Sequence, residues 1–273
     1  MALTRSAAAL SAIALVFSLS ACGSDAETDA KTIRVGVSPG PYSVLFQDGI
    51  DPILTEEGWN IEYTEFTDLQ QADIAVQEGS VDLNVDQHTA YMNVFNREKN
   101  ADLASFTEIP TVPAGLYSER HSTMDAVAEG QTVAIPQDAS NTSRAYNILA
   151  SAGWIEIKDG ADPALLTEND IINDRYKLDI KTMDSATIPR ALPDLDWAVI
   201  PGAISYSSKV DPSLQLFQET LRPELILVAA TRSDEIGEEW TKAVADAYRD
   251  DSFHEFLDKE NVNNYWFVPE SIR

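Results

Sequence analysis

Short apolar runs alternate with helix-like segments along most of this chain, and this alternation constrains the fold more than any other feature. The run at 32–38 ends at Pro39-Gly40-Pro41, and the run at 59–66 alternates apolar and polar residues as a half-buried strand does. Further strands are predicted at 81–85, 132–136, 178–183, 197–200 and 225–230. Helices are predicted up to residue 54, at 68–78, 87–99 and 140–152, and in one long closing segment around Trp240 and Tyr248. This order is typical of α/β proteins with mostly parallel sheets.

Two extended stretches, near 110–118 and 210–224, interrupt the alternation and predict two α/β lobes. We expect the first lobe to comprise 32–112 plus 215–273 and the second to comprise 113–214. Ligands in such sheets bind at the carboxyl ends of the strands. Because two lobes enclose a cleft that can close around a ligand, this organisation favours a solute-capturing protein.

The only cysteine, Cys22, closes the run Leu19-Ser20-Ala21-Cys22, which follows Arg5 and an apolar stretch. This order is typical of a secretory signal, and the four residues resemble the bacterial lipobox, whose cysteine becomes the lipidated first residue of the mature protein. We predict a signal peptide at 1–21, lipid attachment at Cys22, a flexible tether at 22–31 and a place on the extracytoplasmic face of the cell membrane. The apolar stretch falls short of the roughly 20 residues that a transmembrane helix needs.

The composition argues against several classes of function. With 45 acidic and 19 basic residues the chain carries a net charge of −26, so phosphate backbones should repel it and nucleic acid is a poor partner. The three histidines, His88, His121 and His254, lack metal-ligand spacing. The mature chain has no Ser-His-Asp motif, glycine-rich phosphate loop or reactive thiol, so we expect neither an enzyme nor a cofactor.

The segment 136–144 is the strongest local candidate for a ligand site. It joins a predicted strand to a predicted helix that Asp138 or Ser140 can cap, which leaves backbone N–H groups free. Arg144, one turn into that helix, offers a planar guanidinium suited to a carboxylate. The same pattern also fits a capped surface helix with a solvated arginine.

Two further segments are expected to reach the same cleft. Asp86 and His88 follow the short strand at 81–85, where Asp86 could pair with an ammonium group and His88 could donate a hydrogen bond. The alternative is that Asp86 caps a helix and His88 is structural. The strand at 197–200 ends in Pro201-Gly202, which would deliver backbone to the cleft, although most such turns have no further role.

Four ordered blocks, together with the lipobox, resemble the NlpA/MetQ family of methionine-binding lipoproteins, the capture subunits of methionine ABC importers. The blocks are VGVSPGPY at 35–42, DLNVDQHTAYMNVFN at 82–96, the segment 112–160 and DLDWAVIPGAISY at 194–206. The resemblance implies a two-lobed α/β fold of the type II periplasmic-binding-protein kind, with the ligand in the interlobe cleft and with ABC permease and ATPase subunits as partners. It also implies that Arg144 grips the ligand carboxylate beside Asn141 and that His88 contacts the ligand. The predicted ligand-binding residues are Tyr42, Val85, Asp86, His88, Ser140, Asn141, Arg144, Pro201 and Gly202.

The departures from the family pattern concern the ligand itself. Family members usually carry aromatic residues where Val85 and Asp86 stand, and an asparagine where Pro201 stands. Proline offers neither a side-chain hydrogen bond nor a backbone N–H. We hypothesise that Asp86 replaces that asparagine as the ammonium partner, a contact worth about 1.5–3 kcal/mol. The predicted ligand is an amino acid, with L-methionine first. The alternatives are another amino acid, a short peptide, or a surface lipoprotein without a transport role.

Overall fold

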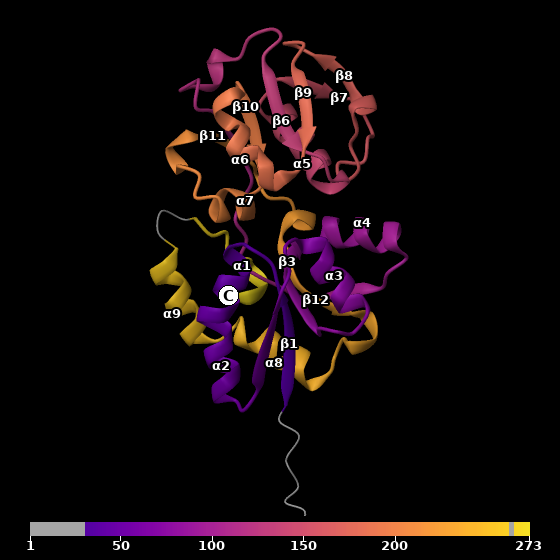
Figure 1. The fold of residues 1–273 in the computed structure, drawn as a ribbon, viewed down its shortest axis with the longest axis vertical. Helices are drawn as coiled ribbons and strands as arrows, with labels where there is room; N and C mark the ends of the chain where they lie inside the picture. Colours follow the sequence, from indigo (N-terminus) through magenta and orange to yellow (C-terminus); the bar gives the residue numbers. More distant parts are fainter. Residues whose placement is uncertain (1–30, 262–264) are drawn as a thin grey trace, which may run out of the picture. The chain divides into compact units, whose positions relative to one another are not determined.

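The computed structural model describes residues 31–261 and 265–273, which build two five-stranded sheets with helices packed around them (Figure 1). The predicted signal peptide, Cys22 and all of the predicted tether except Lys31 lie outside the described residues. Within the described ranges, no helix is long and apolar enough to cross a membrane.

The first sheet has the strand order β2-β1-β3-β12-β4. Its strands are β1 (Thr32–Val37), β2 (Asn60–Glu65), β3 (Leu83–His88), β4 (Leu103–Glu108) and β12 (Leu227–Arg232). Strand β1 pairs in parallel with β2 and β3, whereas β12 returns from late in the chain and runs antiparallel to both β3 and β4. This sheet and the helices on its faces are called the first lobe below.

Helices cover both faces of the first sheet, which explains why its central strands are apolar on both sides. One face carries α1 (Pro41–Leu45), the π-helical turn Phe46–Ile50, α2 (Asp51–Glu56), α8 (Glu239–Ala247) and α9 (Asp251–Glu260). The other face carries α3 (Leu69–Gln77) and α4 (Thr89–Lys99). The core of the first face includes the fully buried Ile33, Phe46 and Tyr248.

The second sheet has the order β11-β5-β10-β6-β9 and, with its helices, forms the second lobe. Its strands are β5 (Gly115–Tyr117), β6 (Thr132–Pro136), β9 (Asp179–Met183), β10 (Trp197–Ile200) and β11 (Gln215–Gln218). Helix α5 (Ala139–Ser151) covers one face, and α6 (Ile188–Ala191) and α7 (Gly202–Ser207) cover the other. Strands β7 (Ile155–Ile157) and β8 (Ile171–Asp174) form a separate antiparallel pair.

Most predicted elements are confirmed, with three differences. The predicted long closing helix is two helices, because the chain breaks after α8 and Asp250 caps α9 by accepting a hydrogen bond from the Ser252 N–H. Strand β11 pairs with β5 in the second sheet, although residues from 215 onward were assigned to the first lobe. Strand β3 runs on to His88, so the helix predicted from residue 87 begins at Thr89.

Two crossovers, 109–114 and 219–226, connect the lobes, and the second contains a 3-10 turn at Pro223–Leu225. Hydrogen bonds join the two crossovers to each other and to the first lobe. The Glu219 N–H donates to the carbonyl oxygen of Ala114 at 3.1 Å. The Tyr42 hydroxyl oxygen accepts a hydrogen bond from the Val112 N–H at 3.1 Å. Gly202 packs so closely on the first crossover that a Cβ there would lie 2.4 Å from the Val112 carbonyl oxygen, so only glycine fits.

Candidate functional site

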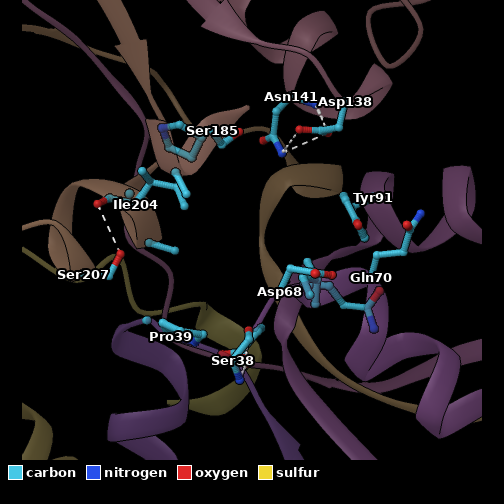
Figure 2. Close-up of a pocket in the computed structure, with 18 of the residues that line it drawn as sticks. Ser38, Pro39, Asp68, Gln70, Tyr91, Asp138, Asn141, Ser185, Ile204 and Ser207 are labelled. Carbon is cyan, nitrogen blue, oxygen red and sulfur yellow. Dashed lines mark hydrogen bonds between the residues drawn. The ribbon is translucent and has the colours of Figure 1, made fainter. Parts of the chain in front are cut away.

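A cavity of about 640 Å³ lies between the two lobes, a size typical of small-molecule sites. Its lining comes from segments that follow strands of both sheets, as expected for ligand sites in α/β folds. In Figure 2, Asn141 and Asp138 of the second lobe lie across the open space from Ser38 and Pro39 of the first, with Asp68, Gln70 and Tyr91 beside it. We refer to this cavity as the cleft.

Three helices begin at the cleft, each capped by a side chain that lines it. Asp138 caps α5 by accepting from the Asn141 N–H at 2.9 Å. Asp68 caps α3 by accepting from the Gln71 N–H at 3.0 Å. His88 caps α4, its Nδ1 accepting from the Tyr91 N–H at 3.1 Å. Because helix N-termini carry partial positive charge, these ends of α3, α4 and α5 favour negative groups in the cleft.

Arg144 lies one turn into α5 and reaches the cleft, but its guanidinium already has an internal partner. Its Nε–H donates to both carboxylate oxygens of Glu219, at 3.0 and 2.9 Å, and its Nη2 also donates to Oε1. Both side chains are only 5% exposed. Burial alone would lower the pKa of Arg144, but the charge and hydrogen bonds of Glu219 raise it above its ordinary value. Its Nη1 makes no hydrogen bond to any described residue.

Asp86 of β3 also lines the cleft, and its carboxylate is hydrogen-bonded to the segment that follows β1. It accepts hydrogen bonds from the Ser38 N–H at 2.9 Å, the Ser38 hydroxyl at 2.8 Å and the Ser43 hydroxyl at 2.8 Å. Burial raises the pKa of Asp86, and the hydrogen bonds from the two serines oppose that shift. A ligand ammonium at Asp86 would therefore share a carboxylate that already has three donors.

His88 is buried and uncharged at neutral pH. Burial, followed by the charge of Arg144, lowers the pKa of His88 to about 3, while the Asn141 side chain acts in the opposite direction. Since Nδ1 accepts the helix-capping hydrogen bond, the single ring proton resides on Nε2, a donor that has the Asn141 side chain as its neighbour. Asn141 itself donates from its side chain to both oxygens of Asp138, at 3.1 and 3.2 Å.

The other predicted site residues divide into two groups. Tyr42, Pro201 and Gly202 line the cleft together with Asp86, His88, Asn141 and Arg144. Val85 and Ser140 do not line it, which corrects their assignment. Val85 is fully buried, and it packs in the core of the first lobe with residues of β1 and α1. Ser140 is buried inside the first turn of α5, where Asp138 rather than Ser140 is the cap.

Several residues that line the cleft were not predicted from the sequence. Gln87 lines the cleft, and its Nε2 donates to Asp73 Oδ1 at 2.6 Å. Its Oε1 accepts no hydrogen bond from any described residue. Leu69, Ile204 and Leu227 are aliphatic residues of the cleft lining. Gln87 belongs to the block at 82–96 that resembles the family, but the sequence does not indicate its pairing with Asp73. No group of three or more His, Cys, Asp or Glu side chains in the described part of the chain could hold a metal ion.

Known proteins resemble this chain over most of its length. The D-methionine-binding lipoprotein MetQ of Salmonella typhi is 28% identical over 255 residues, which cover 92% of this chain and 93% of that protein. A nutrient-binding protein from Burkholderia cenocepacia, solved with methionine bound, superposes with a TM-score of 0.80 at 28% identity over 86% of this chain and 99% of that one.

A third relative is the substrate-binding protein of a methionine transporter from Streptococcus pneumoniae, with a TM-score of 0.79 at 27% identity over 88% of this chain and 96% of that one. These superpositions confirm the predicted two-lobed, periplasmic-binding-protein-like fold class. The sequence profile described as NlpA lipoprotein matches residues 33–269. The chain therefore belongs to the NlpA lipoprotein family.

Proposed function

We propose that this protein is an extracytoplasmic solute-binding protein, anchored by a lipid on Cys22, that captures an amino acid in the cleft and delivers it to an ABC permease and its ATPase. The observation that carries the proposal is the placement of Arg144 beside the N-terminus of α5 in a cleft formed by both lobes. L-methionine is the first ligand to test, with D-methionine beside it, because one relative is named for D-methionine binding and another was solved with methionine bound.

The polar groups of the cleft match the carboxylate of an amino acid. Arg144 Nη1 makes no hydrogen bond within the described chain, and the Nε2–H of His88 is a second donor, placed beside the Asn141 side chain. A guanidinium binds carboxylates through parallel N–H donors, and a neutral imidazole adds a third. We assign the ligand carboxylate to the space that Arg144, His88 and Asn141 border.

The ammonium group requires acceptors, and the first lobe supplies them. Pro201 and Leu227, which line the cleft, offer no side-chain hydrogen bond. Asp86 places its carboxyl group in the cleft wall, and Gln87 Oε1 is a buried acceptor without a donor among the described residues. We assign the ammonium group to Asp86 with Gln87 beside it, because a buried acceptor left unpaired costs about 1–3 kcal/mol.

Aliphatic residues of the cleft lining, Leu69, Ile204 and Leu227, suit a ligand with an apolar side chain. Methionine meets this requirement, since its flexible thioether adapts to irregular apolar surfaces. The cleft volume of about 640 Å³ also leaves room for a larger solute. A different apolar amino acid or a short peptide with the same α-amino end is therefore the second candidate.

A thermal-unfolding screen tests the proposal. The chain without residues 1–22 would be unfolded and refolded to remove any bound ligand, then heated with each amino acid and with methionyl dipeptides. A ligand at 100 times its dissociation constant should add about 2.7 kcal/mol to the free energy of unfolding. N-acetylmethionine and methioninamide, which lack the charged ammonium and the carboxylate respectively, are the matched controls.

A shift with L-methionine that both controls reduce would support the proposal. A shift with another amino acid or a dipeptide alone would move the specificity and keep the binding function. If no amino acid or peptide raised the unfolding temperature, the proposal would fail. The transport role has its own test: cells without this protein should accumulate the labelled ligand more slowly, and an unchanged uptake rate would favour a surface lipoprotein.

A further inference from the structure

Glu219 is the one side chain that joins the carboxylate-binding arginine to both crossovers in the described structure. Its Oε1 accepts from Arg144 Nε and Nη2 and from the Ala114 N–H, the last at 2.6 Å. Its own N–H donates to the Ala114 carbonyl oxygen at 3.1 Å. Arg144 lines the cleft and Glu219 does not. A ligand in the cleft would therefore contact the guanidinium and not the Glu219 carboxylate.

From this arrangement we propose that Glu219 is a specificity-determining residue: an internal carboxylate that permanently shares the charge of Arg144 and so weakens the binding of ligand carboxylates. The inference rests on the proposed function, because it concerns the affinity of the same site. Glu219 fills the Nε–Nη2 edge of the guanidinium and leaves Nη1 for the ligand.

The electrostatic argument follows from the geometry. A ligand carboxylate bound to Nη1 would lie about 4 Å from the guanidinium charge and about 6–7 Å from the Glu219 carboxylate, and Coulomb energy falls with the inverse of distance. Repulsion from Glu219 would then cancel more than half of the attraction from Arg144. The pair is buried on both sides, so solvent and salt screen this repulsion weakly.

The crossover contacts keep Glu219 in place as a competitor. A surface carboxylate could rotate into water when a ligand arrives, but Glu219 is only 5% exposed and its Oε1 is bonded to the backbone of Ala114. The ligand carboxylate must therefore bind an arginine that remains paired. A solute-binding protein that has to release its cargo to a permease is served by such a reduced affinity.

The test is isothermal titration of the refolded mature chain and of Glu219→Gln with two probes, L-methionine and L-methioninamide. The amide variant can retain the hydrogen bonds accepted at Oε1 while removing the charge. We expect it to bind L-methionine about tenfold or more tightly than the wild type, because the repulsion is gone. Methioninamide has no carboxylate, so its affinity should stay the same or fall.

Glu224→Gln is the matched control. Glu224 lies on the same crossover and pairs with Arg222 at 3.2 Å, away from the cleft lining, so its charge removal should leave both affinities unchanged. If Glu219→Gln does not fold, Glu219→Asp retains the charge but withdraws it from Arg144, and L-methionine binding should again become tighter.

Weaker binding of L-methionine by the Glu219 variants would overturn the inference, since it would mean that Glu219 orients the arginine for the ligand. An equal change for both probes would also overturn it, by showing a purely structural role. If the wild type bound neither probe, the proposed methionine-type ligand would be at fault instead, and the comparison between variants would be repeated with the solute found in the thermal screen.

Discussion

Replacing His88 with asparagine should reduce the loss of unfolding free energy that the protein suffers as the pH falls below 7. In the folded protein burial and Arg144 lower the pKa of His88 to about 3, whereas an unfolded histidine has a pKa of about 6.5. A base whose pKa is lowered by folding contributes its full stability above the unfolded pKa. That stability is lost as the pH falls through 6.5 towards 3, because only the unfolded chain takes up the proton.

The size of the effect follows from the two pKa values. Between pH 7.5 and 5.5, protonation of the unfolded histidine should cost about 1.4 kcal/mol of unfolding free energy, and by pH 4.5 the loss should reach about 2.7 kcal/mol. The structure adds a reason: His88 Nδ1 accepts the capping hydrogen bond from Tyr91 N–H, and a protonated ring cannot accept it. Asparagine is a good N-cap without a titratable group, so His88→Asn keeps the cap.

The assay is equilibrium urea unfolding of the ligand-free mature chain at pH 7.5, 6.5, 5.5 and 4.5, for the wild type and His88→Asn in parallel. All other titrating groups are shared, so they cancel in the difference between the two proteins. We expect that difference to shift by about 1.4 kcal/mol in favour of the variant from pH 7.5 to 5.5. Parallel curves over this range would refute the assignment of His88 as a buried neutral base.

Three further substitutions test other parts of the site. Arg144→Ala leaves Glu219 buried without its cation, so unfolding free energy should fall by about 3–5 kcal/mol and the ligand-induced thermal shift should vanish. Gly202→Ala places a methyl group 2.4 Å from a crossover carbonyl oxygen and should cost about 1–3 kcal/mol in urea unfolding, whereas Gly40→Ala, whose nearest contact would be 3.7 Å away, should change stability by at most about 0.5 kcal/mol. Asp86→Asn should weaken ligand binding about tenfold in calorimetry, and an unchanged affinity would exclude the ammonium contact.

Local sequence patterns predicted the elements better than the contacts between them. Strand β6 and helix α5 were found within one residue because apolar periodicity and flanking Pro and Gly mark them. The side chain of Val85 was misplaced because the strand was predicted to end at residue 85, whereas β3 runs on to His88 and its register against β12 shifts between residues 84 and 87. The exact face of each residue depends on pairing with β12, which lies far away in the sequence.

The Arg144–Glu219 pair could not have been found from local pattern for the same reason. The two residues are 75 positions apart, and they meet only because the second crossover passes beneath α5. The sequence marks Arg144 as a residue near a helix start, and it marks Glu219 as one of many acids in an acidic chain. Neither segment indicates whether the guanidinium of Arg144 is free for a ligand or already paired with a carboxylate of the protein.

The acidic residues of the cleft bear on which ligand charge the site selects. Asp68, Asp138 and Asp184 each accept a hydrogen bond from a backbone N–H at a helix start, and Asp86 accepts from Ser38. Their negative charge is therefore offset by helix N-termini and local donors, and it does not by itself call for a cationic ligand.

Among the cleft groups that make no hydrogen bond within the described residues are the Nη1 of Arg144, the Oε1 of Gln87 and the Oδ1 of Asn141. A cationic donor near neutral acceptors is the complement of a carboxylate with an N–H group near it. These unpartnered groups favour a zwitterionic α-amino acid over either a simple cation or a simple anion. Because Glu219 shares the arginine, recognition has to depend on both ends of the ligand together, and removing either end should weaken binding more than removing part of its side chain.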